Sequence, residues 1–242
     1  EALAVRPDNL LSLKQIHSAE CLYIDKAWNE RPSADSLVTD KPGLALGILT
    51  ADCGPVLFYG EKANGSPVIG AAHAGWGGAF KGVLEATIKT MIDHGALLET
   101  LRATLGPCIG PDSYEVGMDF MATFLNENPE SENFFLPARD GEHRMFSLPG
   151  YIENRLAAAG VRVVAVDLDR TALEVVCDRI GSAGGQAIAA VTDVSDGAQV
   201  ERMVQETRQR FGDPDILFAN AAIQLAKPVV EIKALTGTAG AG

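Results

Sequence analysis

Three residues in the first third of the chain have side chains that could bind one transition metal together. They are His17, Cys53 and His73, and they lie too far apart for a local motif to fix their geometry. Imidazole and thiolate are ligands that suit zinc and copper. Three protein ligands leave one tetrahedral position open, which is typical of a catalytic zinc rather than a structural one. The alternative is a buried cysteine that packs as a small apolar residue, with two unrelated histidines.

Two further residues near these candidates could take part in chemistry. Asp52 precedes Cys53 and could carry protons or orient a metal ligand, although an Asp in a turn also caps local N–H groups. Cys108 stands in a constrained Gly-Pro-Cys-Ile-Gly turn, where it could act as a thiolate, a further metal ligand or a proton donor. A buried turn cysteine without a chemical role is the alternative. We therefore predict Cys53, Asp52 and Cys108 as catalytic residues.

A glycine-rich segment, Gly75-Trp76-Gly77-Gly78, follows shortly after His73. Apolar spacing predicts a helix over 79–94, so the glycines would lie at a helix start. Free N–H groups at such a start attract anions, and this predicts a phosphate site there. The segment does not match the nucleotide P-loop pattern, and a plain turn is the alternative.

Five motifs follow one another along residues 10–160 and contain the candidate residues. They are Lys14-Gln15-Ile16-His17-Ser18, Ser33-Ala34-Asp35-Ser36-Leu37-Val38-Thr39, Thr50-Ala51-Asp52-Cys53, Ala71-Ala72-His73-Ala74-Gly75-Trp76 and Gly106-Pro107-Cys108-Ile109-Gly110. With these motifs the chain resembles a bacterial family of laccase-like multicopper polyphenol oxidases, which is also read as a family of zinc-dependent purine nucleoside phosphorylases. The resemblance implies that His17, Cys53 and His73 bind zinc, with copper as the alternative.

The same resemblance implies an activity. It indicates phosphorolysis of adenosine, inosine and methylthioadenosine, together with deamination of adenosine. The alternative is copper-dependent oxidation of phenols by dioxygen, although the four histidines of the chain are too few for the trinuclear cluster of a conventional laccase. The family's N-terminal Arg-Gly-Gly signature and its final Phe-Ser-Tyr-Arg-Arg segment are absent from the sequence. We expect their absence to affect turnover more than metal binding.

Composition and charge exclude several other classes of protein. The chain has 242 residues and a formal net charge of −12, which argues against a surface that follows the phosphates of a nucleic acid. No apolar run approaches the length of a membrane span. Four cysteines in a chain of this length do not make a disulfide scaffold, so we expect reduced thiols and a cytoplasmic protein. The expected partners are small molecules rather than nucleic acid or membrane.

Hydrophobic periodicity predicts the elements that position Cys53 and the first histidine. Alternation over 10–25 predicts a strand, with His17 near its middle or end. The apolar run 44–50 predicts a strand buried on both faces. Asp52 and Cys53 would then lie at the C-terminal end of that strand, where open α/β sheets commonly place functional groups.

The second histidine is expected at the end of a hairpin. An Asn-Gly turn joins strands predicted at 56–59 and 68–73, and the second strand ends at His73. Other strands are expected at 36–39 and 101–105, and helices at 116–126 and up to residue 159. We assign surface roles to the two remaining histidines, His94 and His143.

Residues 161–234 differ in character from the preceding part of the chain. Their pattern predicts alternating strands and helices, which implies a parallel sheet with right-handed crossovers. The expected elements are 161–167, 171–182, 186–192, 199–211 and 215–220. This segment resembles the middle of a short-chain dehydrogenase. The resemblance implies that Asp167 matches the ribose-binding acid, Asp193-Val194 the adenine contact, and Asn220-Ala221-Ala222 the Asn-Asn-Ala-Gly segment.

Binding of NAD by this segment is the third and least favoured interpretation. The glycine-rich turn that holds the pyrophosphate should precede Val161, and no such turn stands there. No tyrosine follows Tyr151, so the Tyr-x-x-x-Lys pair of the dehydrogenases is absent. We interpret the chain as a fusion with its junction near 155–161.

These patterns together predict an α/β protein. We expect a layered α-β-β-α sandwich with mixed sheets, followed by a partial Rossmann-like β-α-β-α-β segment. The predicted domains are a metal-site enzyme domain at 1–160, which lacks the family's N-terminal segment, and a dehydrogenase-like fragment at 161–235. Residues 236–242 are expected to form a disordered tail.

Overall fold

The computed structural model describes residues 6–28, 30–106, 108–167, 170–182, 186–193 and 196–211. The longest group of strands consists of β2 (Cys21–Tyr23), β3 (Ser36–Thr39), β5 (Gly54–Glu61), β6 (Pro67–Ala74), β7 (Arg102–Leu105), β11 (Arg162–Asp167) and β12 (Gln186–Val191). Shorter strands are β1 (Leu10–Leu11), β4 (Ala45–Leu46), β8 (Glu115–Val116), β9 (Phe135–Pro137) and β10 (Arg144–Phe146). The α-helices are α1 (Trp76–Lys81), α2 (Val83–Asp93), α3 (Met118–Glu127), α4 (Leu148–Ala158), α5 (Arg170–Ser182) and α6 (Gly197–Phe211).

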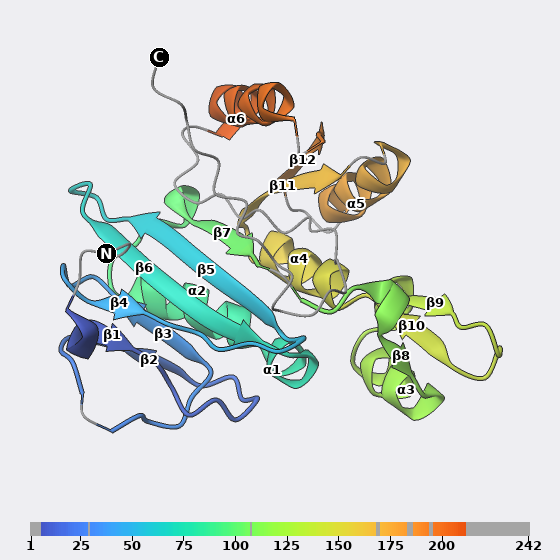
Figure 1. Cartoon of the computed structure of the whole chain (residues 1–242), viewed down its shortest axis with the longest axis horizontal. Coiled ribbons are helices and arrows are strands. Elements are labelled where there is room, and N and C mark those ends of the chain that lie inside the picture. The colour runs from blue at the N-terminus through green and yellow to red at the C-terminus, as the bar shows by residue number, and fades with distance from the viewer. Residues whose placement is uncertain are drawn as a thin grey trace, which may run out of the picture.

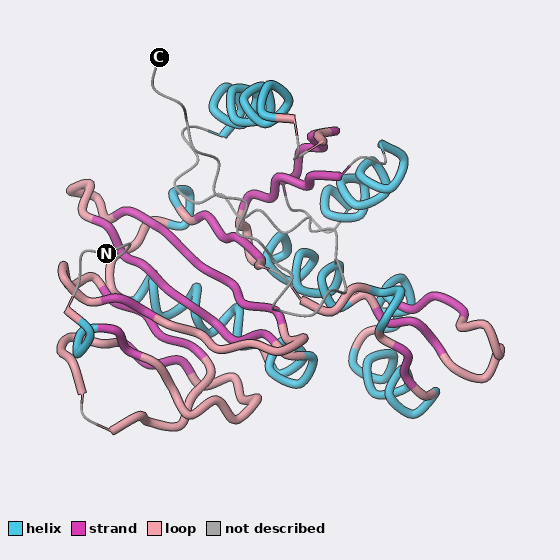
Figure 2. The backbone as a smooth tube through the Cα atoms, in the orientation of Figure 1, coloured by secondary structure: helices cyan, strands magenta, loops and turns pink. Residues whose placement is uncertain are grey.

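Seven of the described strands form one mixed sheet, in the order β12-β11-β7-β5-β6-β3-β2. Figure 1 shows the long β5–β6 hairpin within it, and β11 with β12 beyond β7. β1 pairs with β4, while β8, β10 and β9 form a separate small sheet. Helices and mixed sheets make up the described chain, as Figure 2 shows. The predicted α/β class with mixed sheets is therefore confirmed, and none of the described helices is long and apolar enough to cross a membrane.

The β5–β6 hairpin brings the segments around Cys53 and His73 together. The two strands pair in antiparallel register along their whole length. The predicted Asn-Gly turn closes the hairpin, with Gly65 at a φ of 78°, a conformation that glycine adopts without strain. Because Pro55 lies opposite His73, the residue before β5 and the end of β6 lie at the same edge of the sheet.

Helix α2 packs on the sheet against β2, β3 and β6. Its apolar positions recur at helical spacing, and the side chains on one face are buried. They are Val83, Leu84, Thr87, Ile88 and Met91. The helix predicted over 79–94 is thus confirmed in position, but helical structure begins earlier, at Trp76. It is broken into α1 and α2 at Gly82, where the φ of 97° lies in the left-handed region.

The strand predicted over 10–25 is wrong. β1 and β2 occupy the two ends of that range and belong to different sheets, and the loop between them carries His17. The φ of His17 is 56°, far from the φ of any strand. The Asp35 carboxylate accepts hydrogen bonds from the backbone N–H groups of this loop. These N–H groups are therefore satisfied without a neighbouring strand.

The strand predicted over 44–50, buried on both faces, is also wrong. β4 covers two residues of this run, and Leu49 is 66% exposed. Alternate side chains of the run pack on a small second core instead of entering the main sheet. That core consists of Leu11, Leu13, Ile24, Ala34 and Leu37. Cys53 consequently precedes β5 and does not follow a buried strand.

The C-terminal strands extend the main sheet beyond β7. β11 pairs in parallel with β12 along its whole length, and with β7 at Arg162 opposite Arg102. α5 connects β11 to β12 and contacts both, and α4 contacts α5 and β11. The first four elements predicted for this segment are confirmed, with ends shifted by two residues or fewer. The predicted strand 215–220, Asn220-Ala221-Ala222 and the tail 236–242 lie outside the described residues.

Candidate metal centre

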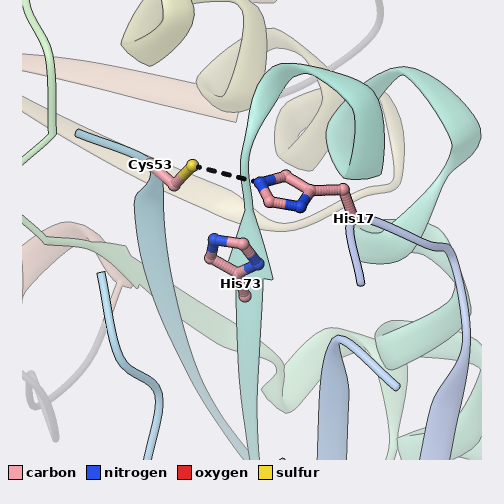
Figure 3. Close-up of side chains that lie close together, drawn as sticks. All are labelled: His17, Cys53 and His73. Atoms are coloured by element: carbon pink, nitrogen blue, oxygen red, sulfur yellow. Dashed lines mark hydrogen bonds between the residues drawn. The ribbon is translucent and has the colours of Figure 1, made fainter. Parts of the chain in front are cut away.

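His17, Cys53 and His73 meet at one edge of the main sheet. One ligand atom from each lies within 4.8 Å of the others, and Figure 3 shows the three side chains around a common space. The Cys53 Sγ and His17 Nε2 atoms are 3.8 Å apart. In a tetrahedral zinc site, bonds of about 2.3 Å to sulfur and about 2.0 Å to nitrogen would place these atoms about 3.5 Å apart. The three donor types therefore suit one zinc or copper ion, and the spacing of Cys53 and His17 is close to that of a tetrahedral site.

His73 is held by a carboxylate. It lies near the end of β6, as predicted, and is 4% exposed. Its Nδ1 is 2.9 Å from the Oδ1 of Asp35. Because an ionised carboxylate only accepts hydrogen bonds, Nδ1 carries a proton and donates it to Asp35, which leaves Nε2 as the atom that could bind a metal. Histidine ligands of metals are commonly oriented by such a carboxylate.

Asp35 also connects the loop that carries His17 to the strand that carries His73. It is fully buried and accepts from the backbone N–H groups of Ile16, His17 and Ser18, and from the Ser18 hydroxyl. Burial alone would raise the pKa of its carboxyl, but hydrogen bonds from His73, Ser18 and Ile16 hold that pKa below its usual range. Asp35 belongs to one of the five sequence motifs, but no role was predicted for it. The available signal was a charged residue directly before a fully buried strand, which needs partners.

Two residues at the cluster have strained backbones. Within the described ranges, His17 and Asp52 are the non-glycine residues with positive φ, at 56° and 73°. Such conformations cost on the order of 1–3 kcal/mol each and concentrate at functional sites. Lys81 donates a hydrogen bond to the carbonyl of His17 at 2.8 Å, which supports this conformation. Strain is therefore located in the two loops that present His17 and Cys53.

The side chain of Gln15 joins these two loops. Its amide nitrogen donates to the carbonyl of Leu49 at 2.7 Å, and its amide oxygen accepts from the N–H of Leu49 at 2.9 Å. A side chain thus satisfies both backbone groups of one residue, as a neighbouring strand would. The loop after β1 is thereby fixed to the loop before β5.

The glycine-rich segment after β6 permits close contact with the candidate ligands. A Cβ at Gly75 would lie 2.8 Å from the Cys53 Sγ and 3.0 Å from the His17 Cδ2, which is too close. Gly77 and Gly78 lie inside α1, which starts directly after Gly75. Close packing therefore explains Gly75 and also Gly78, where a Cβ would lie 3.2 Å from the His73 carbonyl oxygen, whereas Gly77 has room for a Cβ. The sequence predicts a phosphate site at the turn after His73. In the structure this segment forms the first turn of the short helix α1.

Both thiols at the site favour the protonated form. Burial raises the pKa of Cys53, and the negative charges of Asp52 and Asp35 raise it further. Burial is also the main reason why the pKa of Cys108 is raised to about 11. The N–H of Ile109 donates to the carbonyl of Asp52 at 2.8 Å, which brings the turn of Cys108 beside Cys53. A metal cation would displace the Cys53 proton, whereas Cys108 keeps its proton at neutral pH.

The other two histidines lie in different surroundings. His94 stacks on Tyr23, with ring centroids 3.5 Å apart. His143 follows β9 and pairs through Nδ1 with Asp140, in an exposed group that also includes Glu115. Neither histidine belongs to the group formed by His17, Cys53 and His73.

The fold and this cluster define an α/β protein with a candidate metal centre of two histidines and one cysteine. Residues 1–177 match the model of the family described as multi-copper polyphenol oxidoreductase laccase, and the chain belongs to this family. The resemblance stated from the five motifs is thus confirmed. Residues 151–236 match the model of the short chain dehydrogenases, and the two matches overlap over residues 151–177, which contain most of α4, β11 and the first part of α5.

Similar proteins point to the same family. A purine nucleoside phosphorylase of Rickettsia prowazekii is 34% identical over 157 residues, which are 65% of this chain and 63% of the relative. The structure of the hypothetical protein YfiH of Bacillus licheniformis has a TM-score of 0.57 at 26% identity, covering 66% of this chain and 62% of that one. A Neisseria meningitidis protein has a TM-score of 0.54 at 27% identity, covering 84% and 70%. This chain thus spans less than two thirds of the length of the Rickettsia enzyme.

Proposed function

We propose that the chain is a metal-dependent purine nucleoside phosphorylase in which His17, Cys53 and His73 bind zinc. The observation that carries the proposal is the convergence of these three side chains, which leaves one tetrahedral position for a substrate. Relatives named purine nucleoside phosphorylase support the reaction type. Adenosine, inosine and methylthioadenosine are the proposed substrates.

The chain's own residues have distinct tasks around the metal. When bound, zinc supplies Lewis-acid chemistry, because it draws electron density from the atom it contacts. Asp35 keeps the proton of His73 on Nδ1 and so directs the free Nε2 lone pair toward the metal position. Its hydrogen bonds to the backbone around His17 keep the second imidazole in place. Asp35 is therefore a positioning residue that does not contact the substrate.

Phosphorolysis exchanges one bond at the ribose carbon C1′. A phosphate oxygen forms a bond to C1′ while the bond from C1′ to the purine nitrogen breaks, and the purine leaves with a proton. Cys108 retains its thiol proton at neutral pH, which makes it our candidate donor of that proton. Asp52 is exposed beside Cys53 and is our candidate for exchanging protons with solvent.

Deamination of adenosine is the second reaction that we assign to this site. Water adds at C6 of the base, the bond from C6 to the amino group breaks, and ammonia leaves with one added proton. Asp52 would carry the proton from the attacking water to the departing nitrogen. This reaction needs no phosphate, so the two activities can be separated by leaving phosphate out.

Product analysis of adenosine incubated with the zinc-loaded protein tests the proposal. Adenine and ribose 1-phosphate that form only with phosphate would establish phosphorolysis, and inosine without phosphate would establish deamination. Cys53→Ser should lose most of the bound zinc and both products. Cys177→Ser, on α5, is the matched control and should retain both. Unchanged zinc content in the Cys53 variant would contradict the site.

The family description favours a second candidate function, the oxidation of phenols by dioxygen with copper. Thiolate and imidazole also suit copper, and the affinity order favours copper over zinc. Reduction of dioxygen to two waters takes four electrons and four protons, which four phenols would supply one each. Oxygen uptake with a phenol, abolished by chelation and restored only by copper, would support this function. No uptake by the copper-loaded protein would exclude it.

A further inference from the structure

Trp76, the first residue of α1, exposes 40% of its surface beside the candidate metal centre. Both of its neighbours in the sequence approach candidate ligands. A Cβ at Gly75 would lie 2.8 Å from the Cys53 Sγ, and one at Gly77 would lie 3.9 Å from the His17 Cβ. Trp76 therefore directly follows a glycine that packs closely against two candidate ligands. The residue remains partly in solvent there, and its indole offers a flat apolar face on which a ligand could stack.

An aromatic core supports this ring from behind. The indole meets Phe120 of α3 edge to face, with ring centroids 4.9 Å apart. Phe120 in turn packs on Phe124 and Phe146, with centroids 5.1 Å and 5.3 Å away, and both of these are fully buried. The exposed part of the indole is thus held in place. A ligand that stacks on it does not have to order a mobile side chain.

Tyr114 packs on the same Phe120, with ring centroids 6.2 Å apart. It follows the turn of Cys108, which the hydrogen bond from Ile109 to Asp52 fixes against the loop of Cys53. Burial is the main reason why the pKa of Tyr114 is raised, and the negative charge of Asp52 raises it further. Its hydroxyl therefore keeps its proton and can donate a hydrogen bond.

We propose that Trp76 and Tyr114 bind the flat base of the substrate, with the base stacked on the exposed indole and its polar edge directed to the Tyr114 hydroxyl. The inference deepens the proposed function and rests on it for the identity of the base as a purine. Purines have large π-faces, and removal of an aromatic platform weakens the binding of a base by about 5- to 100-fold. The base would thus be held beside the metal position by side chains that are not metal ligands.

Indole fluorescence provides a direct test. Trp28 is the other tryptophan of the chain and packs on the second core, so Trp28→Phe leaves Trp76 as the single reporter. In the zinc-loaded Trp28→Phe protein, adenine and adenosine should quench the fluorescence, and ribose should not. A lack of quenching by adenine at millimolar concentration would overturn the inference. Quenching by catechol and not by adenine would overturn the assignment of the base as a purine.

Equilibrium dialysis of adenosine gives an independent measurement. Trp76→Ala should raise the Kd by about 5- to 100-fold at unchanged zinc content, and Trp76→Phe should restore most of the affinity. Wild-type affinity in Trp76→Ala would overturn the inference. Binding of adenosine without any phosphorolysis would contradict the proposed function alone. Phosphorolysis that Trp76→Ala leaves unchanged would contradict the base-binding role alone.

Discussion

The Asp35 carboxylate holds two candidate ligands at once, the ring of His73 and the backbone of His17. Asp35→Asn has the same shape, but its amide group offers one acceptor atom instead of two and adds donors. We expect zinc affinity to fall by about 10- to 100-fold. We also expect the free energy of unfolding to fall by about 1–3 kcal/mol, because buried donors lose their acceptor. Competition with a chromophoric chelator and urea unfolding measure the two effects.

Ser36→Ala is the matched control for Asp35→Asn. Ser36 is the next residue, is equally buried, and shares a hydrogen bond of 2.6 Å with Thr87 away from the metal cluster. This variant should lose stability and keep its zinc affinity. Equal zinc affinity in wild type and Asp35→Asn would show that Asp35 supports the fold without positioning a ligand.

Asp52→Asn separates proton transfer from backbone conformation. Asp52 has a φ of 73°, and asparagine tolerates this left-handed region as well as aspartate does. The substitution should therefore leave the zinc content and the midpoint of thermal unfolding unchanged. Loss of a general acid or base typically lowers the rate about 100-fold or more, so we expect that reduction in kcat for both reactions. Undiminished kcat would identify Asp52 as a turn residue only.

For single residues, the sequence shows which side chains could bind a metal, but it does not show which contacts hold them. The metal candidates His17, Cys53 and His73 could be selected because their chemistry is specific and the resemblance connects them. The role of Asp35 depends on two segments that are distant in the sequence and meet only in the folded chain. The positive φ of His17 likewise results from tertiary contacts, and no local sequence pattern predicts it.

Gly82 separates α1 from α2, and its left-handed backbone conformation ends the first helix and starts the second. Its φ is 97°, and a Cβ there would also lie 3.4 Å from the Glu85 carboxylate. Gly82→Ala should lower the free energy of unfolding by about 1–2 kcal/mol. Gly181→Ala is the control. Gly181 lies in the last turn of α5 with open space around it, so this substitution should raise the free energy of unfolding by about 0.4–1 kcal/mol. Urea unfolding measures both, and an unchanged Gly82 variant would contradict the need for a left-handed residue.

The Asp40 carboxylate connects Tyr23 of β2 with Lys62 of the β5–β6 hairpin, and also pairs with Lys41. Hydrogen bonds from these groups, led by Lys62, hold the pKa of Asp40 far below its usual range. A carboxyl with a depressed folded pKa contributes stability above its unfolded pKa of about 3.9, and this contribution is lost as pH falls toward the folded pKa. Asp40→Asn should therefore be less stable than wild type at pH 7, with a difference that shrinks below about pH 4.

Urea unfolding of both proteins at pH 7, pH 4 and pH 3 measures this difference. Asp8→Asn serves as the control, because Asp8 is exposed near the N-terminal end of the described chain. The free energy of unfolding of Asp8→Asn should equal that of wild type at each of the three pH values. A difference between Asp40→Asn and wild type that stays constant with pH would contradict the assignment.

The elements that were predicted correctly carry strong local signals. The β5–β6 hairpin has an Asn-Gly turn between two apolar runs, and α2 has apolar residues at helical spacing. The runs 10–25 and 44–50 are apolar as well, but their side chains fill a separate small core. Apolar periodicity shows that a segment is buried on one side. It does not show which core the segment joins.

For the whole molecule, zinc should act as a stabilising ligand. Its three proposed ligands come from distant parts of the chain, so the unfolded state does not offer the site. Free zinc at 100 times its Kd would add about 2.7 kcal/mol to the free energy of unfolding. For a chain of this size the midpoint should then rise by roughly 5–10 °C. Thermal unfolding with and without zinc measures the shift.

Two variants complete this test of zinc binding. Cys53→Ser should unfold at the same temperature with and without zinc, because it lacks the central thiolate. Cys177→Ser should keep the full shift, since Cys177 lies on α5. An equal shift in wild type and Cys53→Ser would place the stabilising ion elsewhere.

The parallel pairing of β11 with β7 joins the dehydrogenase-like segment to the main sheet. The separate domains predicted at 1–160 and 161–235 rested on a change of sequence pattern, and their independence stays a prediction. A change of family along a chain need not interrupt a sheet, because a parallel strand needs only a crossover helix and a free sheet edge. Here α4 lies between β10 and β11 in the chain and contacts β7 and β11.

The hydrogen bonds between Gln15 and Leu49 have a consequence for how long a bound ion remains in place. Since they connect the two loops that present His17 and Cys53, and Asp35 connects the first loop to His73, the backbones that carry the ligands are not free to move independently. Dissociation would require the loops to open together, in one rare event. The residence time of the ion would then be set by loop opening, and Gln15→Ala should shorten it with little change in the ligands themselves.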